Sequence, residues 1–209
     1  MKFQDLLNNI SAKQTHGVCK RKFSTGFLSI DQSTALINEA TFSYFENYAE
    51  KNDFVQKFQD LKSGVRQNNT ENRAVTHFKY REPESDLYSK SLDEIEVLAK
   101  LIKTNFKKII IFGIGGSYLG PKLMHDVFSN DEIEINFVTG SDSAEFEKFK
   151  NLDLSEYGLV IASKSFSTLE TLKSYEVITK NKYLNNTFAV TASRKSAIDF
   201  GINANNCLL

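Results

Sequence analysis

Two short segments of the chain combine residue types that bind anions well. The first, residues 113–121, reads Gly-Ile-Gly-Gly-Ser-Tyr-Leu-Gly-Pro. Its glycines permit a sharp turn and a close approach of backbone N–H groups to a ligand, and Ser117 adds a hydroxyl where a helix is expected to begin. The spacing is not the dinucleotide fingerprint G-x-G-x-x-G, and no Gly-Lys-Ser/Thr follows as in a P-loop. The segment predicts a phosphate site or, alternatively, a glycine-rich turn without a ligand.

The second segment, residues 163–168, reads Ser-Lys-Ser-Phe-Ser-Thr and offers four hydroxyls and the Lys164 ammonium group. An alternative needs no ligand, because residues 167–170 have the Ser-x-x-Glu pattern of a helix capping box. A capping box explains neither Lys164 nor the other hydroxyls. Each segment follows an expected buried strand, and ligand loops of open α/β sheets gather at the carboxyl edge of the strands. The two segments therefore predict one shared anion pocket.

The second half of the chain has the pattern that would position these segments. Short β-branched apolar runs indicate strands at 109–112, 135–138, 159–162 and 187–191. Helix-length stretches lie between them, at 119–129, 144–149 and 168–179. Strands that alternate with helices form a mainly parallel sheet covered on both faces. We therefore predict a doubly wound α/β domain over residues 107–209.

The first half, residues 1–106, indicates a mainly helical region. Apolar residues recur at helical spacing at 37–48, at 54–61 and at 92–102, and we interpret these stripes as core packing. Residues 91–94 read Ser-Leu-Asp-Glu, a capping box that predicts the start of the last helix.

Composition excludes several classes of partner. The 26 Lys and Arg residues balance the 26 Asp and Glu residues, and neither half carries a basic excess, so a nucleic-acid partner is not expected. No apolar run approaches the roughly 20 residues that span a bilayer, so no membrane partner is expected. The two cysteines, Cys19 and Cys207, have neither a disulfide nor a metal-site spacing, and they favour a cytoplasmic location.

The two segments together resemble the glucose-6-phosphate isomerase family, also called phosphoglucose isomerase. The resemblance rests on residues 113–121 and on residues 163–171, which read Ser-Lys-Ser-Phe-Ser-Thr-Leu-Glu-Thr. Residues 69–77 are similar to a family stretch that ends in Arg-Ala-Val-Leu-His. Residues 190–193 and 200–202 are similar to the end of the family's first sugar isomerase (SIS) domain.

The resemblance implies an isomerase that interconverts glucose 6-phosphate and fructose 6-phosphate without a metal or nucleotide cofactor, and a homodimer for the full-length enzyme. It implies that the sugar phosphate is held by Gly116, Ser117, Ser163, Lys164, Ser165 and Thr168. Arg73 would lie near the pocket. Ser165 stands where threonine is usual and keeps a hydroxyl, whereas Thr76 replaces the usual leucine before His77 and weakens the case for that histidine.

The family's catalytic glutamate, its ring-opening histidine and a Gly-Gly-Arg segment would all follow the matched region, and none is present up to Leu209. We therefore expect an N-terminal portion of the enzyme that holds the phosphate loops, has no catalytic residue and is inactive by itself. One alternative is a self-standing sugar-phosphate-binding module with a regulatory role. Another is a structural domain with empty glycine turns. The reading frame downstream of Leu209 would distinguish the first two.

Overall fold

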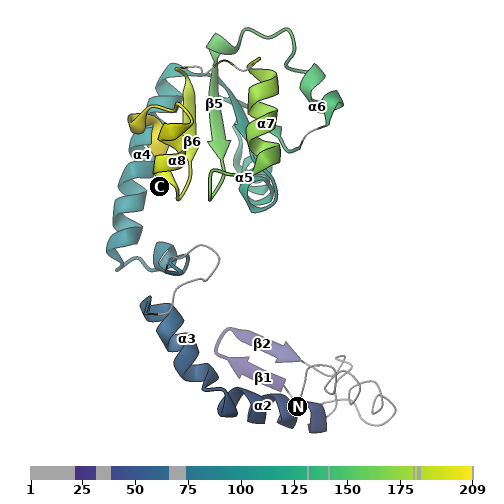
Figure 1. Cartoon of the computed structure of the whole chain (residues 1–209), viewed down its shortest axis with the longest axis vertical. Coiled ribbons are helices and arrows are strands. Elements are labelled where there is room, and N and C mark those ends of the chain that lie inside the picture. The colour runs from purple at the N-terminus through teal and green to yellow at the C-terminus, as the bar shows by residue number, and fades with distance from the viewer. Residues whose placement is uncertain are drawn as a thin grey trace. The chain divides into compact units, whose positions relative to one another are not determined.

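The computed structural model describes residues 22–31, 39–65, 74–130, 132–140, 142–180, 182 and 185–208. The chain divides into two compact units, residues 1–78 and residues 79–209 (Figure 1).

The described residues of the first unit form two helices and a β-hairpin. Helices α2 (Glu39–Lys51) and α3 (Phe54–Ser63) confirm the helices expected there. The hairpin pairs β1 (Lys22–Thr25) with β2 (Leu28–Asp31) in antiparallel register, and it was not expected from the sequence.

The apolar stripes of these two helices are largely exposed. Tyr48 is 54% exposed, Phe54 is 62% exposed and Phe58 is 54% exposed. The interpretation of these stripes as core packing is therefore wrong for these side chains. The periodicity identified helices, but the described elements of the unit leave these three side chains more than half exposed.

The second unit is built on a parallel sheet of five strands. Its spatial order is β4 (Glu134–Val138), β3 (Lys108–Phe112), β5 (Tyr157–Ala162), β6 (Thr187–Val190) and β7 (Cys207–Leu208). All four expected strands are present and every neighbouring pair is parallel, which confirms the α/β class. The two-residue strand β7 was not expected; it pairs with the end of β6.

Five α-helices connect and cover these strands. They are α4 (Asp86–Asn105), α5 (Gly116–Phe128), α6 (Ser143–Glu147), α7 (Leu169–Ile178) and α8 (Arg194–Asp199). Short 3-10 turns lie at η1 (Lys79–Arg81), η2 (Leu154–Glu156) and η3 (Ala204–Asn206).

The start of α4 differs from the expected one. Ser85 caps this helix, since its side chain accepts a hydrogen bond from the Leu87 N–H at 3.3 Å. Ser91 lies inside the helix, so the helix is confirmed and the capping box at residues 91–94 is wrong. Both serines precede an acidic residue and an apolar stripe, and the sequence pattern alone does not choose between them.

Side chains alternate between two apolar layers on opposite faces of the sheet. On one face, Leu98 of α4 packs with Ile109 and Val160. On the other, Leu159 and Tyr175 of α7 belong to the larger core cluster. Figure 1 shows α4 and α7 on opposite sides of the strands. The strands are thus buried between helices, as their β-branched runs require.

Candidate functional site

The order of the strands creates a topological switch point between β3 and β5. These two strands are hydrogen-bonded neighbours, and Phe112 is in register with Ile161 near their carboxyl ends. From β3 the chain enters α5 and returns as β4 on one side. From β5 it enters α7 and continues outward to β6 and β7 on the other side. The loops that leave β3 and β5 therefore diverge to opposite faces, and such a crevice is where open α/β sheets bind ligands.

The loop after β3 is pressed against the end of β5. A Cβ atom on Gly113 would lie 3.0 Å from the Ser117 carbonyl oxygen and 3.3 Å from the Ala162 carbonyl oxygen. Only glycine fits this position without displacing backbone atoms. Ala162 directly precedes the serine-rich segment, so the two segments meet at Gly113.

The glycine-rich segment leads directly into the first turn of α5. Gly115 is the N-cap residue, with φ 54° and ψ −122°, a conformation that side-chain-bearing residues avoid. Gly116 and Ser117 are the first two residues of the helix, which begins earlier than the 119–129 stretch expected from sequence. The N–H groups of Ser117 and Tyr118 donate within this turn, to the carbonyls of Ile114 and Gly115, each at 3.0 Å. The positive end of the helix dipole still favours an anion at this carboxyl edge of the sheet.

The hydroxyls of the second segment form two pairs. Ser163 Oγ lies 3.0 Å from Thr168 Oγ1, and Ser165 Oγ lies 2.7 Å from Ser167 Oγ. Ser163 is buried, whereas Lys164 and Ser165 are exposed at the edge. The segment therefore presents an ammonium group and hydroxyls whose hydrogen bonds to one another can be exchanged for bonds to a ligand.

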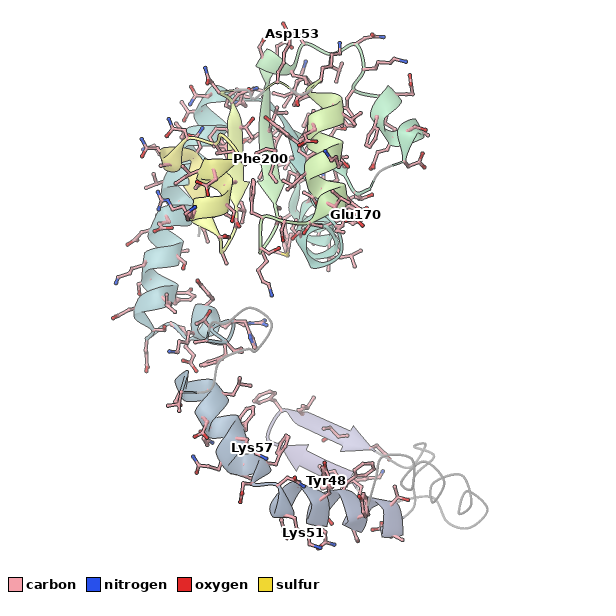
Figure 2. All side chains as sticks on the ribbon, in the orientation of Figure 1. Tyr48, Lys51, Lys57, Asp153, Glu170 and Phe200 are labelled. Atoms are coloured by element: carbon pink, nitrogen blue, oxygen red, sulfur yellow. The ribbon has the colours of Figure 1, made fainter. Side chains whose placement is uncertain are left out.

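The capping-box alternative for this segment is not formed. The N-cap of α7 is Thr168, whose side chain makes no capping hydrogen bond, and the Ser167 hydroxyl bonds to Ser165 instead. In Figure 2, Glu170 marks the first turn of α7 at this edge of the sheet. The hydroxyls thus do not cap the helix, which removes the ligand-free explanation based on that motif.

Six of the seven site residues expected from sequence lie in these two segments. Gly116 and Ser117 come from the first, and Ser163, Lys164, Ser165 and Thr168 come from the second. Arg73 lies outside the described residues. His77 is exposed and its ring makes an edge contact with Phe78 at 5.9 Å.

Three polar residues form hydrogen bonds that fix the neighbouring loops, and none of them was expected from the sequence. The Glu145 carboxylate accepts hydrogen bonds from the Thr139 N–H at 3.1 Å, just after β4. Ser174 Oγ donates to the Gly140 carbonyl, and Thr191 Oγ1 donates to the Lys164 carbonyl. In each of these hydrogen bonds the donor and the acceptor belong to no common sequence motif, so the sequence alone did not indicate these roles.

A cavity of about 630 Å³ lies at the opposite, amino edge of the strands. It is lined by residues around the start of β5 and the end of α7, and Asp153, one of them, lies at the end of the unit opposite Glu170 (Figure 2). Hydrogen bonds from Ser155 hold the pKa of the Asp153 carboxyl below its usual value. Lys150, Lys180 and Lys182 line the cavity as well, and neither of the two loop segments contributes a residue to it.

The described residues contain no group of three or more His, Cys, Asp or Glu side chains placed to hold a metal ion. No helix among them is both long enough and apolar enough to cross a membrane.

Comparison with known proteins identifies the family. A profile described as phosphoglucose isomerase matches residues 31–209. The chain is 29% identical over 213 residues to a glucose-6-phosphate isomerase of Ectopseudomonas mendocina, which covers 86% of this chain and 38% of the relative. A glucose-6-phosphate isomerase of Bifidobacterium longum is 29% identical over 187 residues, covering 77% of this chain and 33% of the relative.

A solved structure supports the fold. The crystal structure of a glucose-6-phosphate isomerase from Chlamydia trachomatis aligns with a TM-score of 0.60 at 20% identity, over 90% of this chain and 44% of that one. The chain thus spans well under half the length of the relatives that it matches. Since the family profile covers far more than half of the 209 residues, the chain belongs to the phosphoglucose isomerase family.

Proposed function

We propose that this chain supplies the sugar-phosphate-binding loops of a glucose-6-phosphate isomerase, with glucose 6-phosphate or fructose 6-phosphate as ligand. Residues 107–209 would form the phosphate-binding domain and residues 1–106 the mainly helical region before it. The observation that carries the proposal is the meeting of the two segments at Gly113, at the switch point between β3 and β5. Family membership supplies the identity of the sugar phosphate.

The chemistry of the two loops suits a phosphate monoester. The first turn of α5 offers the positive end of the helix dipole and the Ser117 hydroxyl. The second segment offers the Lys164 ammonium group and the hydroxyls of Ser163, Ser165 and Thr168. Each hydrogen bond to a charged oxygen contributes about 1.5–3 kcal/mol. These donors, acting together, are sufficient for binding.

The same donors do not perform an isomerisation. Moving a proton between the first and second sugar carbons needs a base near those carbons and stabilisation of an enediolate. Enzymes lower such barriers by about 8 kcal/mol or more, and a phosphate cradle alone offers neither contribution. We propose that none of these 209 residues is catalytic and that the reaction uses no metal or nucleotide cofactor. We also propose that the full-length enzyme is a homodimer.

The binding proposal is tested by titrating the chain with glucose 6-phosphate in a calorimeter. Lys164→Ala should weaken binding by about tenfold, because it removes a charge-assisted contact to the phosphate. The matched control is Lys173→Ala, which removes the same charge from the exposed side of α7, where Lys173 pairs with Glu176 at 2.6 Å. Equal effects of the two substitutions would show that Lys164 does not contact the phosphate.

The proposed lack of turnover has its own test. In a coupled assay that consumes the product of isomerisation, a polypeptide of these 209 residues should show no activity above the blank. The control is the same preparation with added full-length glucose-6-phosphate isomerase, which shows that the assay reports turnover. Activity that stays with the chain through removal of host enzyme would contradict the proposal.

A further inference from the structure

The middle of the serine-rich segment contains a residue in an unusual backbone conformation. Phe166 has φ 52°, in the left-handed region, where bulky residues are rare and strained. Its N–H donates to the Ser163 carbonyl at 3.2 Å and closes a tight turn. This turn puts Ser163 and Phe166 inside and leaves Lys164 and Ser165 exposed at the edge.

The ring of Phe166 holds this strained turn in place. It is only 4% exposed and belongs to the main core cluster. It makes an edge contact with Phe200 at 5.5 Å, and Phe200 contacts Tyr175 of α7 at 5.9 Å. Phe200 follows α8, and Figure 2 labels it in front of the strands. Burial of the aromatic ring offsets the backbone strain, so the core fixes the shape of the segment.

A second attachment holds the segment from the neighbouring loop after β6. The Lys164 carbonyl accepts hydrogen bonds from the Ala192 N–H at 2.9 Å and from Thr191 Oγ1 at 3.2 Å. Thr191 is 3% exposed, and its hydroxyl also accepts a hydrogen bond from the Ser193 N–H at 3.0 Å. The backbone of Lys164 is thereby fixed, although its side chain lies at the surface.

We propose that Phe166 and Thr191 are positioning residues that hold residues 163–168 in a phosphate-binding arrangement before the ligand arrives. The inference rests on the proposed function, because it assigns the ligand of that segment. Neither side chain touches the phosphate. Both act by removing the ordering cost that a mobile loop would impose on binding.

The chain offers a matched control for each residue. Phe149 is also 4% exposed and belongs to the same cluster, but it lines the cavity at the opposite edge. Thr187 is also 3% exposed, and its hydroxyl lies 2.8 Å from Tyr175 Oη, away from the segment. Phe166→Leu is therefore compared with Phe149→Leu, and Thr191→Val with Thr187→Val.

Two measurements are made on each variant of the 209-residue chain. The first is calorimetric titration with glucose 6-phosphate: Phe166→Leu should raise Kd about tenfold and Thr191→Val about threefold, while each control stays within about twofold. Each variant and its control should lower the melting temperature by a similar amount. The second is hydrogen exchange without ligand, in which the amides of Phe166 and Ala192 should exchange faster in Phe166→Leu than in Phe149→Leu.

The outcomes separate this inference from the function on which it rests. A wild-type chain that does not bind glucose 6-phosphate overturns the proposed function, and the exchange comparison then still decides whether these residues order the segment. If the wild type binds and each variant behaves like its control in affinity and exchange, the positioning role is wrong. Loss of affinity that follows the melting temperature in all four variants would also overturn it.

Discussion

Among the described residues of the first unit only Thr41 is buried, whereas the second unit contains two apolar clusters on the two faces of its sheet. Both units contain amphipathic helices. In α3, Phe54 and Phe58 are more than half exposed, while Leu98 of α4 is 8% exposed because strands β3, β5 and β6 lie against it. Helical periodicity therefore defines an apolar face, but a core forms only where a sheet or another helix packs against that face.

A two-stranded hairpin does not provide such a cover. Phe23 of β1 stacks on Phe42 of α2 at 5.8 Å, yet Phe23 itself is 40% exposed. Isolated hairpins are marginally stable, and three or more strands or a packed helix are needed for an independent core. The stability of the described chain is therefore expected to reside in the second unit.

The largest expected effect is in hydrogen exchange along the whole chain. Amides of β5, in the centre of the sheet, should exchange at least about 1000-fold more slowly than amides of α3, because their opening requires global unfolding. Exchange followed by mass spectrometry measures both regions in one sample. Comparable protection of α3 and β5 would show that the first unit unfolds together with the second.

The difference in burial between the two units can also be tested by the effect of substitutions on the free energy of unfolding. Leu159→Ala removes a fully buried side chain of β5 and should lower the free energy of unfolding by about 3–4 kcal/mol. Phe58→Ala in α3 should lower it by less than about 1 kcal/mol, because the ring is largely in solvent already. Urea unfolding followed by circular dichroism measures both. An equal loss would mean that the α3 stripe is buried in solution.

Helix α5 of the second unit has an apolar face that no described element covers. Helix α5 has no buried residue, and its large exposed side chains are Leu119, Leu123, Met124, Val127 and Phe128. An apolar patch of this kind favours association between copies of the chain.

Replacing Leu123 and Val127 by glutamine should reduce self-association several-fold in sedimentation velocity experiments. The control is Phe54→Gln with Phe58→Gln, which changes an exposed apolar stripe of the first unit. A wild-type chain that stays monomeric at high concentration would contradict the expectation. An equal reduction by the control would show that association is not specific to α5.

The sequence was informative about the second unit because its strands are short apolar runs rich in β-branched residues, and β3 and β5 are followed directly by glycine and serine. Strand β7 has two residues, too few for any pattern, and it exists because it pairs with β6. The hairpin at residues 22–31 was missed because the surrounding stripes favoured helix. Strands could therefore be predicted where burial requires a run of apolar residues. They could not be predicted where a strand exists only because it pairs with a neighbour.

The candidate site divides in the same way. The glycine and serine segments were located from sequence, since their residue types carry the chemistry. The left-handed backbone of Phe166 and the hydrogen bond from Thr191 were not, because they depend on Phe200 and on the loop after β6. The phosphate-binding side chains are recognisable within the segment itself, whereas the contacts that hold the segment come from Phe200 at the end of α8 and from Thr191 after β6.

The smallest change in the free energy of unfolding is expected from replacing one strained backbone position in each unit by glycine. Lys180, just after the end of α7, has φ 55°, and Asp53, between α2 and α3, has φ 51°. Glycine adopts this conformation without strain, so Lys180→Gly should raise the free energy of unfolding by about 0.5–1 kcal/mol. Asp53→Gly should raise it by less than about 0.3 kcal/mol, because aspartate tolerates the left-handed region and the first unit adds little to global stability. Urea unfolding of both variants beside the wild type measures the difference, and a larger gain from Asp53→Gly would place the first unit inside the same cooperative transition as the sheet.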